Sequence, residues 1–366
     1  MAEQLRILVA GWLNSPHVAA WADAVVAAGH EAELVGRVVP GWPELELSVR
    51  SHRLAAELPP PLRGLHMSRE LGRVAADYEP DLVHAHYLPE YGWMAAREGL
   101  GPLVCSAWGS DVLAAGRLAR LRSRRALEAA ARVLVDSAHL AREVRALARR
   151  EVRVEIVRWG LDLERFAPGD TAVARASLGL DGEEPVVAGV RGLRPVYNPE
   201  LLLEAFAVVR RRRSDARLLL KHPLDNTPPF VDEAIERLGL GGAVTVLGNV
   251  DAERLPDVYR AADVVVSIPS SDSSPRSVWE ALACARPVVV SDLPWARDEL
   301  EPEGQALLTP LTADAVAEAI GRVLDDEALA VRLGRAGRAL AVAQLEPTAA
   351  AARIDALYRS VLQESR

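Results

Sequence analysis

Cysteine, lysine and long apolar runs are scarce in this sequence. Its two cysteines, Cys105 and Cys284, lie inside apolar runs, so we expect both to be buried and reduced, and they are too few for a metal cluster. Lys221 is the only lysine beside 42 arginines. No run reaches 18 apolar residues, and the N-terminus enters a strand without a basic leader. We therefore expect a cytoplasmic protein that does not span a membrane.

A basic footprint is also missing, because the formal net charge is -8. This charge argues against general binding of nucleic acid. One local exception lies between Arg117 and Arg158, where 12 arginines stand against five acidic residues. The excess is typical of a solvated helix surface. The alternative is a surface for an anionic acceptor or peripheral contact with the inner membrane face.

The motifs of several other enzyme classes are absent. The first strand is followed by AGWLNSPH, which is not the G-x-G-x-x-G turn of a dinucleotide-binding fold. We find no P-loop, no HExxH, no zinc spacing and no Ser-His-Asp order.

What is present is a regular alternation of apolar strand-like runs with helical patterns. Strands are predicted near residues 6, 32, 81, 102, 133 and 154, and again near 186, 217, 244, 264, 287 and 306. This alternation is typical of βαβ units and a parallel sheet, and the length suits two domains. We predict two Rossmann-like doubly wound domains that face a cleft, over residues 1–165 and 166–345. We expect residues 346–366 to form a terminal helix.

The segment from Val264 to Asp292 is the most informative part of the chain. Its apolar start predicts a buried strand, and Ser274 before a proline predicts a helix cap, with the helix running from Pro275 to about Ala285. The first free N–H groups of such a helix favour an anionic phosphate. We expect those of Arg276, Ser277 and Val278 to serve this purpose.

Two carboxylates flank that helix start. Asp272 and Glu280 can accept hydrogen bonds from sugar hydroxyls. The alternative is that Glu280 only pairs with Arg276, four residues earlier, on a solvated helix face.

This acidic-x7-Glu pattern, followed by EALACARPVVVSD, resembles that of retaining GT-B glycosyltransferases of the GT4 type, the glycosyl transferases group 1. The segment WGLDLERFAPGD at 159–170 resembles the sequence that closes the first domain in that family. Asp272 stands where the family usually has glutamate, and Ala285 stands where it usually has glycine. The resemblance implies a nucleotide-diphosphate sugar, UDP- or GDP-linked, as donor. It also implies catalytic roles for Asp272, Glu280 and His86, the last from the HxH segment at 84–86. The resemblance further implies that the terminal helix crosses back to the first domain.

The loop after the strand at 186–190 resembles the family's GRLxPxKG loop, whose cations hold the donor diphosphate. The resemblance therefore implies donor-binding roles for Arg191 and Arg194. We expect the residues at the helix start to bind the donor with them, namely Ser274, Arg276, Ser277 and Val278. Arg191 stands one place early relative to the family's loop, and Tyr197 stands where the lysine would be, so the diphosphate needs another cation. Lys221 is a candidate because it follows a strand at the same sheet edge; the alternative is a surface position with no role.

In the first domain, NSPHV, DLVHAHYLPEYG and SAWGSD each follow a predicted strand. Ligands in such sheets bind beyond the strand ends. We expect His84 to be a core histidine and His86 to face the cleft. Trp12, Trp93 and Trp108 could stack on an acceptor. The expected acceptor side consists of Asn14, Ser15, His17, Trp108 and Asp111.

The resemblance implies an enzyme that moves a sugar to the hydroxyl of a small-molecule, glycan or lipid-linked acceptor. It implies no cofactor and no metal. Two alternatives remain open: a nucleotide-sugar epimerase or phosphorylase of the same fold, and a catalytically silent subunit that binds sugar nucleotides.

Overall fold

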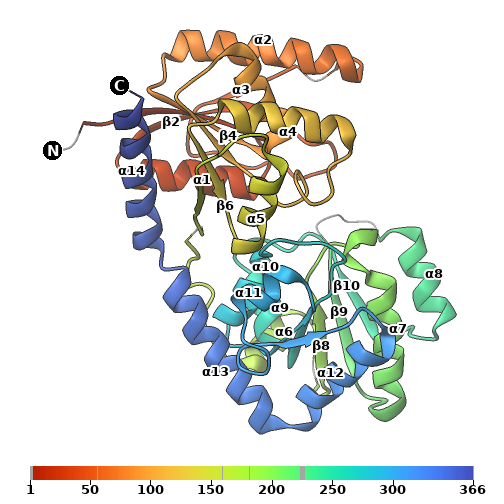
Figure 1. Cartoon of the computed structure of the whole chain (residues 1–366). Coiled ribbons are helices and arrows are strands. Elements are labelled where there is room, and N and C mark those ends of the chain that lie inside the picture. Colours follow the sequence, from red (N-terminus) through yellow and green to blue (C-terminus); the bar gives the residue numbers. More distant parts are fainter. Residues whose placement is uncertain (1–2, 56, 159, 181, 223–226, 366) are drawn as a thin grey trace. The chain divides into compact units, whose positions relative to one another are not determined.

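The structure is a computed structural model that describes residues 3–55, 57–158, 160–180, 182–222 and 227–365 (Figure 1). The chain separates into two compact units. Unit 1 consists of Met1–Gly160 and Pro347–Arg366, and unit 2 consists of Leu161–Glu346. The chain leaves unit 1 after Gly160 and returns to it at Pro347.

Unit 1 is built on a seven-stranded parallel sheet with the strand order β3-β2-β1-β4-β5-β6-β7. The six strands predicted from the sequence are all present. A seventh strand, β3, extends one edge of the sheet. We did not predict it, because its sequence SHR is too short and too polar to give a strand signal. The strands are β1 (Arg6–Ala10), β2 (Glu31–Gly36), β3 (Ser51–Arg53), β4 (Leu82–His86), β5 (Leu103–Ser106), β6 (Arg132–Val135) and β7 (Val154–Ile156).

The helices of unit 1 cover this sheet. They are α1 (Pro16–Ala27), α2 (Pro60–Tyr78), α3 (Trp93–Glu98), α4 (Arg117–Ala129), α5 (Ala138–Leu147) and α14 (Pro347–Glu364), with a π-helix, η1 (Tyr87–Gly92), after β4. The terminal α14 lies beside α1 (Figure 1). There the buried hydroxyl of Tyr358 accepts a hydrogen bond from Trp21 Nε1 at 2.8 Å and lies 2.8 Å from His84 Nδ1. These contacts fasten the end of the chain to unit 1.

Unit 2 holds a six-stranded parallel sheet in the order β10-β9-β8-β11-β12-β13, and all six predicted strands form it. The two doubly wound parallel sheets expected from the sequence are thus confirmed. Its strands are β8 (Val186–Gly189), β9 (Arg217–Lys221), β10 (Val244–Leu247), β11 (Val264–Ser267), β12 (Val288–Ser291) and β13 (Leu307–Thr309).

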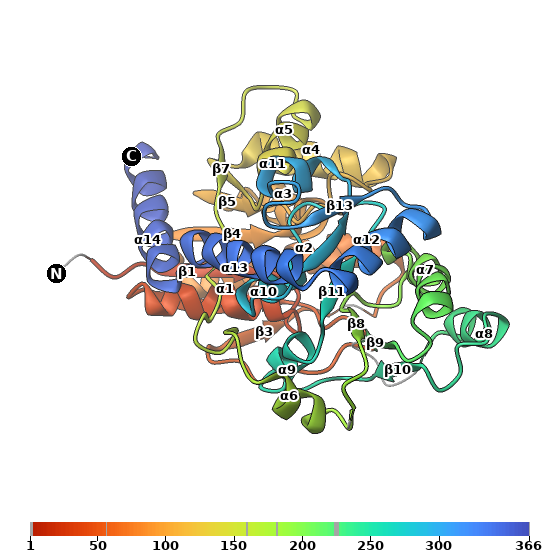
Figure 2. The ribbon, with the colours of Figure 1, turned by 90° about the horizontal axis from the view of Figure 1, so that it is seen from below.

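Helices also cover the second sheet, and α7 lies side by side with α12 on it (Figure 2). On its inner face, α7 buries Leu202, Ala205, Phe206 and Val209. The helices of unit 2 are α6 (Thr171–Ser177), α7 (Pro199–Arg212), α8 (Pro229–Arg237), α9 (Leu255–Arg260), α10 (Arg276–Ala283), α11 (Pro294–Glu299), α12 (Ala313–Asp325) and α13 (Glu327–Gln344), with a 3₁₀ turn, η2 (Pro195–Tyr197).

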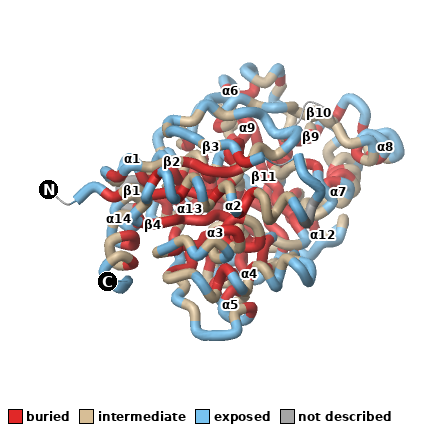
Figure 3. The backbone as a smooth tube through the Cα atoms, turned by 90° about the horizontal axis from the view of Figure 1, so that it is seen from above, coloured by how far each residue is buried: buried red, intermediate tan, exposed pale blue. Residues whose placement is uncertain are grey.

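The central strands form the core of each unit and are buried along their length (Figure 3). Their apolar residues face helices on both sides, which explains the continuous hydrophobic runs. Because all strands in a sheet are parallel, their carboxyl ends lie at one edge. The loops after β8, β9 and β11 therefore meet at one edge of unit 2. Those after β1, β2, β4 and β5 meet at one edge of unit 1.

Candidate functional site

Three polar side chains from two loops and a helix start converge in unit 2. β8 and β11 are neighbours in the sheet, so the loop after β8 meets the segment that leads into α10. Arg191 Nη2 lies 2.7 Å from Asp272 Oδ2, and Arg191 Nη1 donates to Ser277 Oγ at 3.2 Å. The guanidinium also lies over the ring of Tyr197, 4.4 Å from its centroid. Arg191 is thereby fixed beside the first turn of α10.

Asp272 is held in one position by its two oxygens. One pairs with Arg191, and the other accepts the backbone N–H of Ser273 at 3.0 Å. Burial raises the pKa of Asp272, and the charge of Arg191 opposes that rise. The arginine therefore stabilises the ionised carboxylate in a poorly solvated place.

Glu280 lies in a more buried pair of contacts on α10. Its Oε2 accepts the hydroxyl of Tyr259 at 2.6 Å, and its Oε1 lies 3.0 Å from Arg276 Nε. Glu280 therefore does pair with Arg276, as the alternative interpretation expected. It does not lie on a solvated helix face, however, because only 7% of its surface is exposed. A buried carboxylate with two fixed donors keeps lone pairs for further hydroxyl groups.

Sequence reasoning missed Tyr259, which comes from α9 and carries no motif. Burial and the nearby charge of Glu280 raise the pKa of Tyr259, while the charge of Arg191 lowers it. The charges of Glu280 and Arg191 therefore act on Tyr259 in opposite directions. At neutral pH its hydroxyl keeps its proton and donates to Glu280.

Lys221 is half-buried at the end of β9, the strand next to β8. Burial lowers the pKa of Lys221, and the negative charge of Glu280 raises it. The neighbouring His222 Nδ1 accepts the backbone N–H of Leu193 at 3.3 Å, which ties the end of β9 to the loop after β8. The only lysine of the chain therefore lies within the electrostatic reach of Glu280.

Three predictions about the start of α10 need correction. Ser274 does not cap the helix, because its hydroxyl accepts Trp279 Nε1 at 2.8 Å and donates to Glu299 at 2.9 Å; Pro275 is the cap, and α10 spans Arg276–Ala283. The N–H of Val278 already donates to the carbonyl of Pro275, and its side chain is buried in the core. The first-turn amides left for an anion are those of Arg276 and Ser277.

Arg194 lies in the same loop as Arg191 but is exposed, and it makes no contact with the cluster in the described structure. It immediately precedes η2 without capping it through its side chain.

Ala285 takes the place where the resembled family has glycine. Its φ of 56° is left-handed, which explains why glycine suits this position. The next residue, Arg286, donates to the carbonyl of Ala262 and to Thr171 Oγ1. Alanine in place of glycine at position 285 therefore leaves the backbone strained at this residue.

In unit 1, Asn14 and Ser15 are buried and do not form an open loop. The amide group of Asn14 bonds to both the N–H and the carbonyl of Val39 and to the carbonyl of Trp42. Asn14 therefore fixes the loop after β2, which the sequence did not reveal. Ser15 precedes α1, and its hydroxyl is buried without a hydrogen-bond partner in the described structure.

His86 is buried, with 1% of its surface exposed, and does not open to solvent as we expected at a strand end. The reason is that Trp108, which follows β5, folds over it and donates from Nε1 to His86 Nδ1 at 3.3 Å. His84 stacks on His86 with the ring centroids 4.5 Å apart, and it is a core histidine as predicted. Burial and the nearby His17 lower the pKa of His86 to about 3, so its ring is neutral at pH 7.

Asp111 faces inward, which corrects its predicted place on the acceptor side. Its Oδ2 accepts the N–H of Leu88 at 3.0 Å, and its Oδ1 accepts that of Trp108 at 2.9 Å. Burial raises the pKa of Asp111 to about 6. Asp111 thus braces the loops after β4 and β5 against each other.

Four aromatic side chains gather at the carboxyl edge of the first sheet. Trp12 is their centre, with ring centroids 4.7 Å from Tyr87, 5.9 Å from Trp108 and 6.4 Å from Trp42. We call Trp12, Trp42, Tyr87 and Trp108 the aromatic platform. His17 lies at its border, 5.3 Å from the ring of Trp108. Trp93 is not part of it, because that ring stacks with Arg122 of α4.

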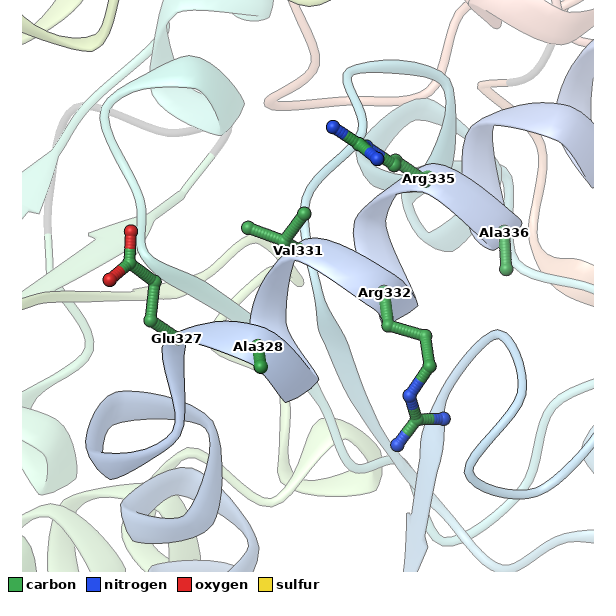
Figure 4. A pocket seen from close by; sticks show the side chains of 6 residues that line it. All are labelled: Glu327, Ala328, Val331, Arg332, Arg335 and Ala336. Carbon is green, nitrogen blue, oxygen red and sulfur yellow. The ribbon is translucent and has the colours of Figure 1, made fainter.

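A pocket lies along α13 and is unrelated to the predicted site (Figure 4). None of the residues predicted for the site lines it; the lining consists of Glu327, Ala328, Val331, Arg332, Arg335 and Ala336. Within the described residues, no group of three or more His, Cys, Asp or Glu side chains is arranged to hold a metal ion. No described helix is long and apolar enough to cross a membrane.

Both halves of the chain match models of known families. Residues 15–165 match the model described as Glycosyltransferase Family 4, and residues 170–340 match the model described as Glycosyl transferases group 1. The second match contains Arg191, Asp272 and Glu280.

Curated relatives include proteins named D-inositol 3-phosphate glycosyltransferase. The one from Gordonia bronchialis is 34% identical over 238 residues, which are 58% of this chain and 51% of that protein. The one from Nocardia farcinica is 33% identical over 276 residues, 69% of this chain and 61% of that protein. The chain thus spans about half the length of the Gordonia relative.

Solved structures share the fold across the whole chain. Sucrose-phosphate synthase from Thermosynechococcus elongatus superposes with a TM-score of 0.84 at 24% identity, over 99% of this chain and all of that one. HepE from Anabaena, in complex with UDP-glucose, gives 0.81 at 18% identity over 98% of this chain and all of that one.

Proposed function

We propose that this chain, which belongs to the glycosyl transferases group 1 family and has the GT-B fold, is a retaining glycosyltransferase. It moves a sugar from a nucleotide-diphosphate donor to a hydroxyl group of an acceptor. The observation that supports this most directly is the cluster of Arg191, Asp272 and Ser277 at the first turn of α10. It joins a fixed cation, helix amides and a carboxylate at one sheet edge.

We assign the donor to unit 2. The diphosphate binds to the amides of Arg276 and Ser277 and to Arg191, with Lys221 as a second cation. Asp272 and Glu280 accept hydrogen bonds from hydroxyl groups of the sugar or ribose. HepE binds UDP-glucose in the same fold, which favours a uridine nucleotide over a guanosine one.

The chemistry in this proposal is mainly electrostatic. The bond from the sugar C1 to the diphosphate oxygen breaks with its electron pair leaving on the diphosphate. A new bond forms from C1 to the acceptor oxygen on the same face, and the acceptor proton passes to the departing diphosphate. Arg191, Lys221 and the helix start stabilise the charge that grows on the leaving group. No metal or cofactor takes part in this scheme.

We assign the acceptor to unit 1. His86 does not serve as a base near neutral pH, because its pKa of about 3 leaves no tendency to take a proton there. Its Nε2 is buried and has no hydrogen-bond partner in the described structure. We propose that this group donates, as a neutral imidazole, to a ligand oxygen.

The test compares UDP-, GDP- and ADP-glucose by thermal shift and then follows donor consumption with and without acceptors. A ligand at 100 times its dissociation constant stabilises a protein by about 2.7 kcal/mol. We expect UDP-glucose to stabilise the chain, to be consumed in an acceptor-dependent way and to give a product with the anomeric configuration of the donor. An inverted product would contradict retention. Donor conversion to another nucleotide sugar without acceptor would indicate an epimerase, and binding without any turnover a silent subunit.

We also propose that α4 contacts an anionic membrane surface. Its Arg117, Arg120 and Arg125 are exposed, and Leu118 and Leu121 are 63% and 53% exposed. Such a mixture of arginine and leucine is typical of helices that lie on anionic lipid.

Sedimentation with phosphatidylglycerol vesicles tests this proposal. The Arg117→Glu, Arg120→Glu pair should abolish binding, while the same charge change at the exposed Arg211 and Arg212 of α7 should have a smaller effect. If both double variants lost vesicle binding to the same extent, binding would depend only on the net charge of the protein, and α4 would have no special role.

A further inference from the structure

The aromatic platform of unit 1 is only partly covered. Trp42 is 40% exposed, and Trp12, Tyr87 and Trp108 are half-buried. These rings come from the loops after β2, β1, β4 and β5, so they lie where ligands bind in parallel sheets. The exposed indole of Trp42 is therefore the ring of the platform that is most open to a ligand.

The platform is held in place by polar contacts. Trp12 Nε1 donates to Glu90 Oε2 at 3.0 Å, and Arg37 pairs with the same carboxylate at 2.6 Å. Asn14 bonds to the backbone of Trp42 and so positions that ring's loop. The rings are therefore arranged before any ligand arrives, which lowers the entropy cost of binding.

The backbone under the platform is strained. Tyr87 has a φ of 74°, although a bulky side chain rarely adopts a left-handed conformation. It opens the π-helix η1, a form that is rare and frequently found at functional sites. Strain of this kind costs of order 1–3 kcal/mol and persists where a site needs a side chain in an unusual place.

The charge at this sheet edge does not suit a phosphate. The segments that follow the seven strands of unit 1 contain no lysine and twice as many carboxylates as arginines. The arginines are Arg37, Arg50 and Arg158, and the carboxylates are Glu44, Glu46, Glu57, Glu90, Asp111 and Asp136.

The arginines of these segments are also poorly placed to bind an anion on the platform. Arg37 is bound to Glu90 through two of its nitrogen atoms. Arg50 directly precedes β3, and its Nη1 lies 3.6 Å from Glu33. Arg158 follows β7, at the far edge of the sheet from β2 and β1. Arg37 does lie over a platform ring, 6.0 Å from the centroid of Trp12, but Glu90 already balances its charge. An anionic group on the platform would thus meet carboxylates and only a cation that is already paired.

From these observations we infer that the acceptor presents a neutral hydroxylated ring, of the sugar or cyclitol class, whose apolar C–H face stacks on Trp42 and Trp12. This inference rests on the proposed function and names its acceptor class. An aromatic face suits such a ring because it covers the C–H groups and leaves the hydroxyls at the rim. Glu90 has lone pairs left to accept one of them. The chain thereby differs from what the relatives' name, D-inositol 3-phosphate glycosyltransferase, indicates for their acceptor.

The test uses matched acceptors that differ only in a phosphate: myo-inositol against inositol 3-phosphate, and glucose against glucose 6-phosphate. Binding is followed by tryptophan fluorescence and calorimetry in the presence of saturating UDP, and transfer is followed with UDP-glucose. We expect the neutral member of at least one pair to bind about tenfold more tightly than its phosphate, a difference of about 1.4 kcal/mol. Tighter binding or faster transfer with both phosphates would overturn the inference.

Substitution of the exposed ring provides the control. Trp42→Ala should weaken binding of the neutral ring about fivefold or more, Trp42→Tyr should restore most of it, and UDP affinity should stay within about twofold in both variants. If Trp42→Ala bound the neutral ring compound as tightly as the unaltered protein does, Trp42 would not belong to the acceptor site. If UDP fails to bind the unaltered protein, the proposed function fails, whereas the preference between matched rings is still measured in buffer without nucleotide.

Discussion

Replacing Arg191 with glutamine tests the donor site most directly. The side chain holds Asp272, Ser277 and the face of Tyr197 at once, and its glutamine replacement can keep at most one of these contacts. A hydrogen bond from a charged group contributes about 1.5–3 kcal/mol. Because one such bond to the diphosphate would be lost, we expect the affinity for UDP to fall about 10- to 100-fold.

The same change also affects folding, because Asp272 loses its cation. The side chains of Arg191 and Asp272 are 18% and 15% exposed, so the pair lies between a surface and a buried ion pair. We therefore expect a loss of about 1–3 kcal/mol in the free energy of unfolding. Adding Asp272→Asn removes the unpaired carboxylate and should restore part of this stability. It should not restore UDP affinity, which separates the structural effect from the binding effect.

Arg194→Gln is the matched control, because Arg194 lies in the same loop and is exposed without contact to the cluster. We would measure the UDP dissociation constant by calorimetry at about 50 and 200 mM salt. Compared with the unaltered protein, the constant should depend less on salt in Arg191→Gln and almost equally in Arg194→Gln. A folded Arg191→Gln protein that binds UDP within about threefold of the original would refute the assignment. A larger loss in Arg194→Gln would place the phosphate on the outer side of the loop.

Three further predictions concern single positions. Ala285→Gly should raise the free energy of unfolding by about 1 kcal/mol in urea titrations, because glycine adopts φ 56° without strain; a loss of stability would contradict this. Tyr259→Phe should cost about 1.5–3 kcal/mol in the same assay, since Glu280 loses a buried donor, and a neutral result would mean that water replaces the hydroxyl. The lowered pKa of His86 means that its contribution is present above pH 6.5 and is lost as the pH falls toward 3. The free energy of unfolding should therefore fall by about 2 kcal/mol between pH 6.5 and pH 5 through His86, and urea titrations of His86→Asn should lack this part of the fall.

The strands of both sheets were predictable because their signal is local. Runs such as RILVA and VVVSI are apolar on both faces, as the centre of a parallel sheet demands, and they recur at βαβ spacing. The β3 strand gave no such signal, because its three residues lie at a sheet edge and face solvent in part. Its existence depends on pairing with β2, which is a tertiary property.

The convergence of Arg191, Asp272 and Ser277 at one sheet edge was predictable for the same reason, since strand ends and helix starts can be located in the sequence. Their partners were not. Nothing adjacent to Tyr259 indicates that its hydroxyl reaches a carboxylate 21 residues away. Likewise, a serine before a proline is a good capping signal, yet Ser274 bonds to Trp279 and Glu299. Which side chain bonds to a given hydroxyl is determined by tertiary packing, and local sequence patterns do not encode that packing.

The first unit was harder to predict because its loops interlock. The burial of His86 depends on Trp108 from a different strand, and the position of Trp108 depends on Asp111, which holds its N–H. Trp42 was missed because it lies in a loop with no motif, and its place at the sheet edge depends on contacts with the loop after β1, from the amide of Asn14 and the ring of Trp12.

Two departures from the family pattern, Arg191 one place early and Tyr197 in place of lysine, become one feature in the structure. The planar guanidinium lies over the tyrosine ring, and this stack points its nitrogen atoms at Asp272 and Ser277. A lysine ammonium has neither the planar face nor the fork of donors that this arrangement uses. Tyr197 therefore orients Arg191 at the helix start and adds no second charge there. Another cation lies at the end of β9, where the negative charge of Glu280 opposes the lowering of the pKa of Lys221 by burial.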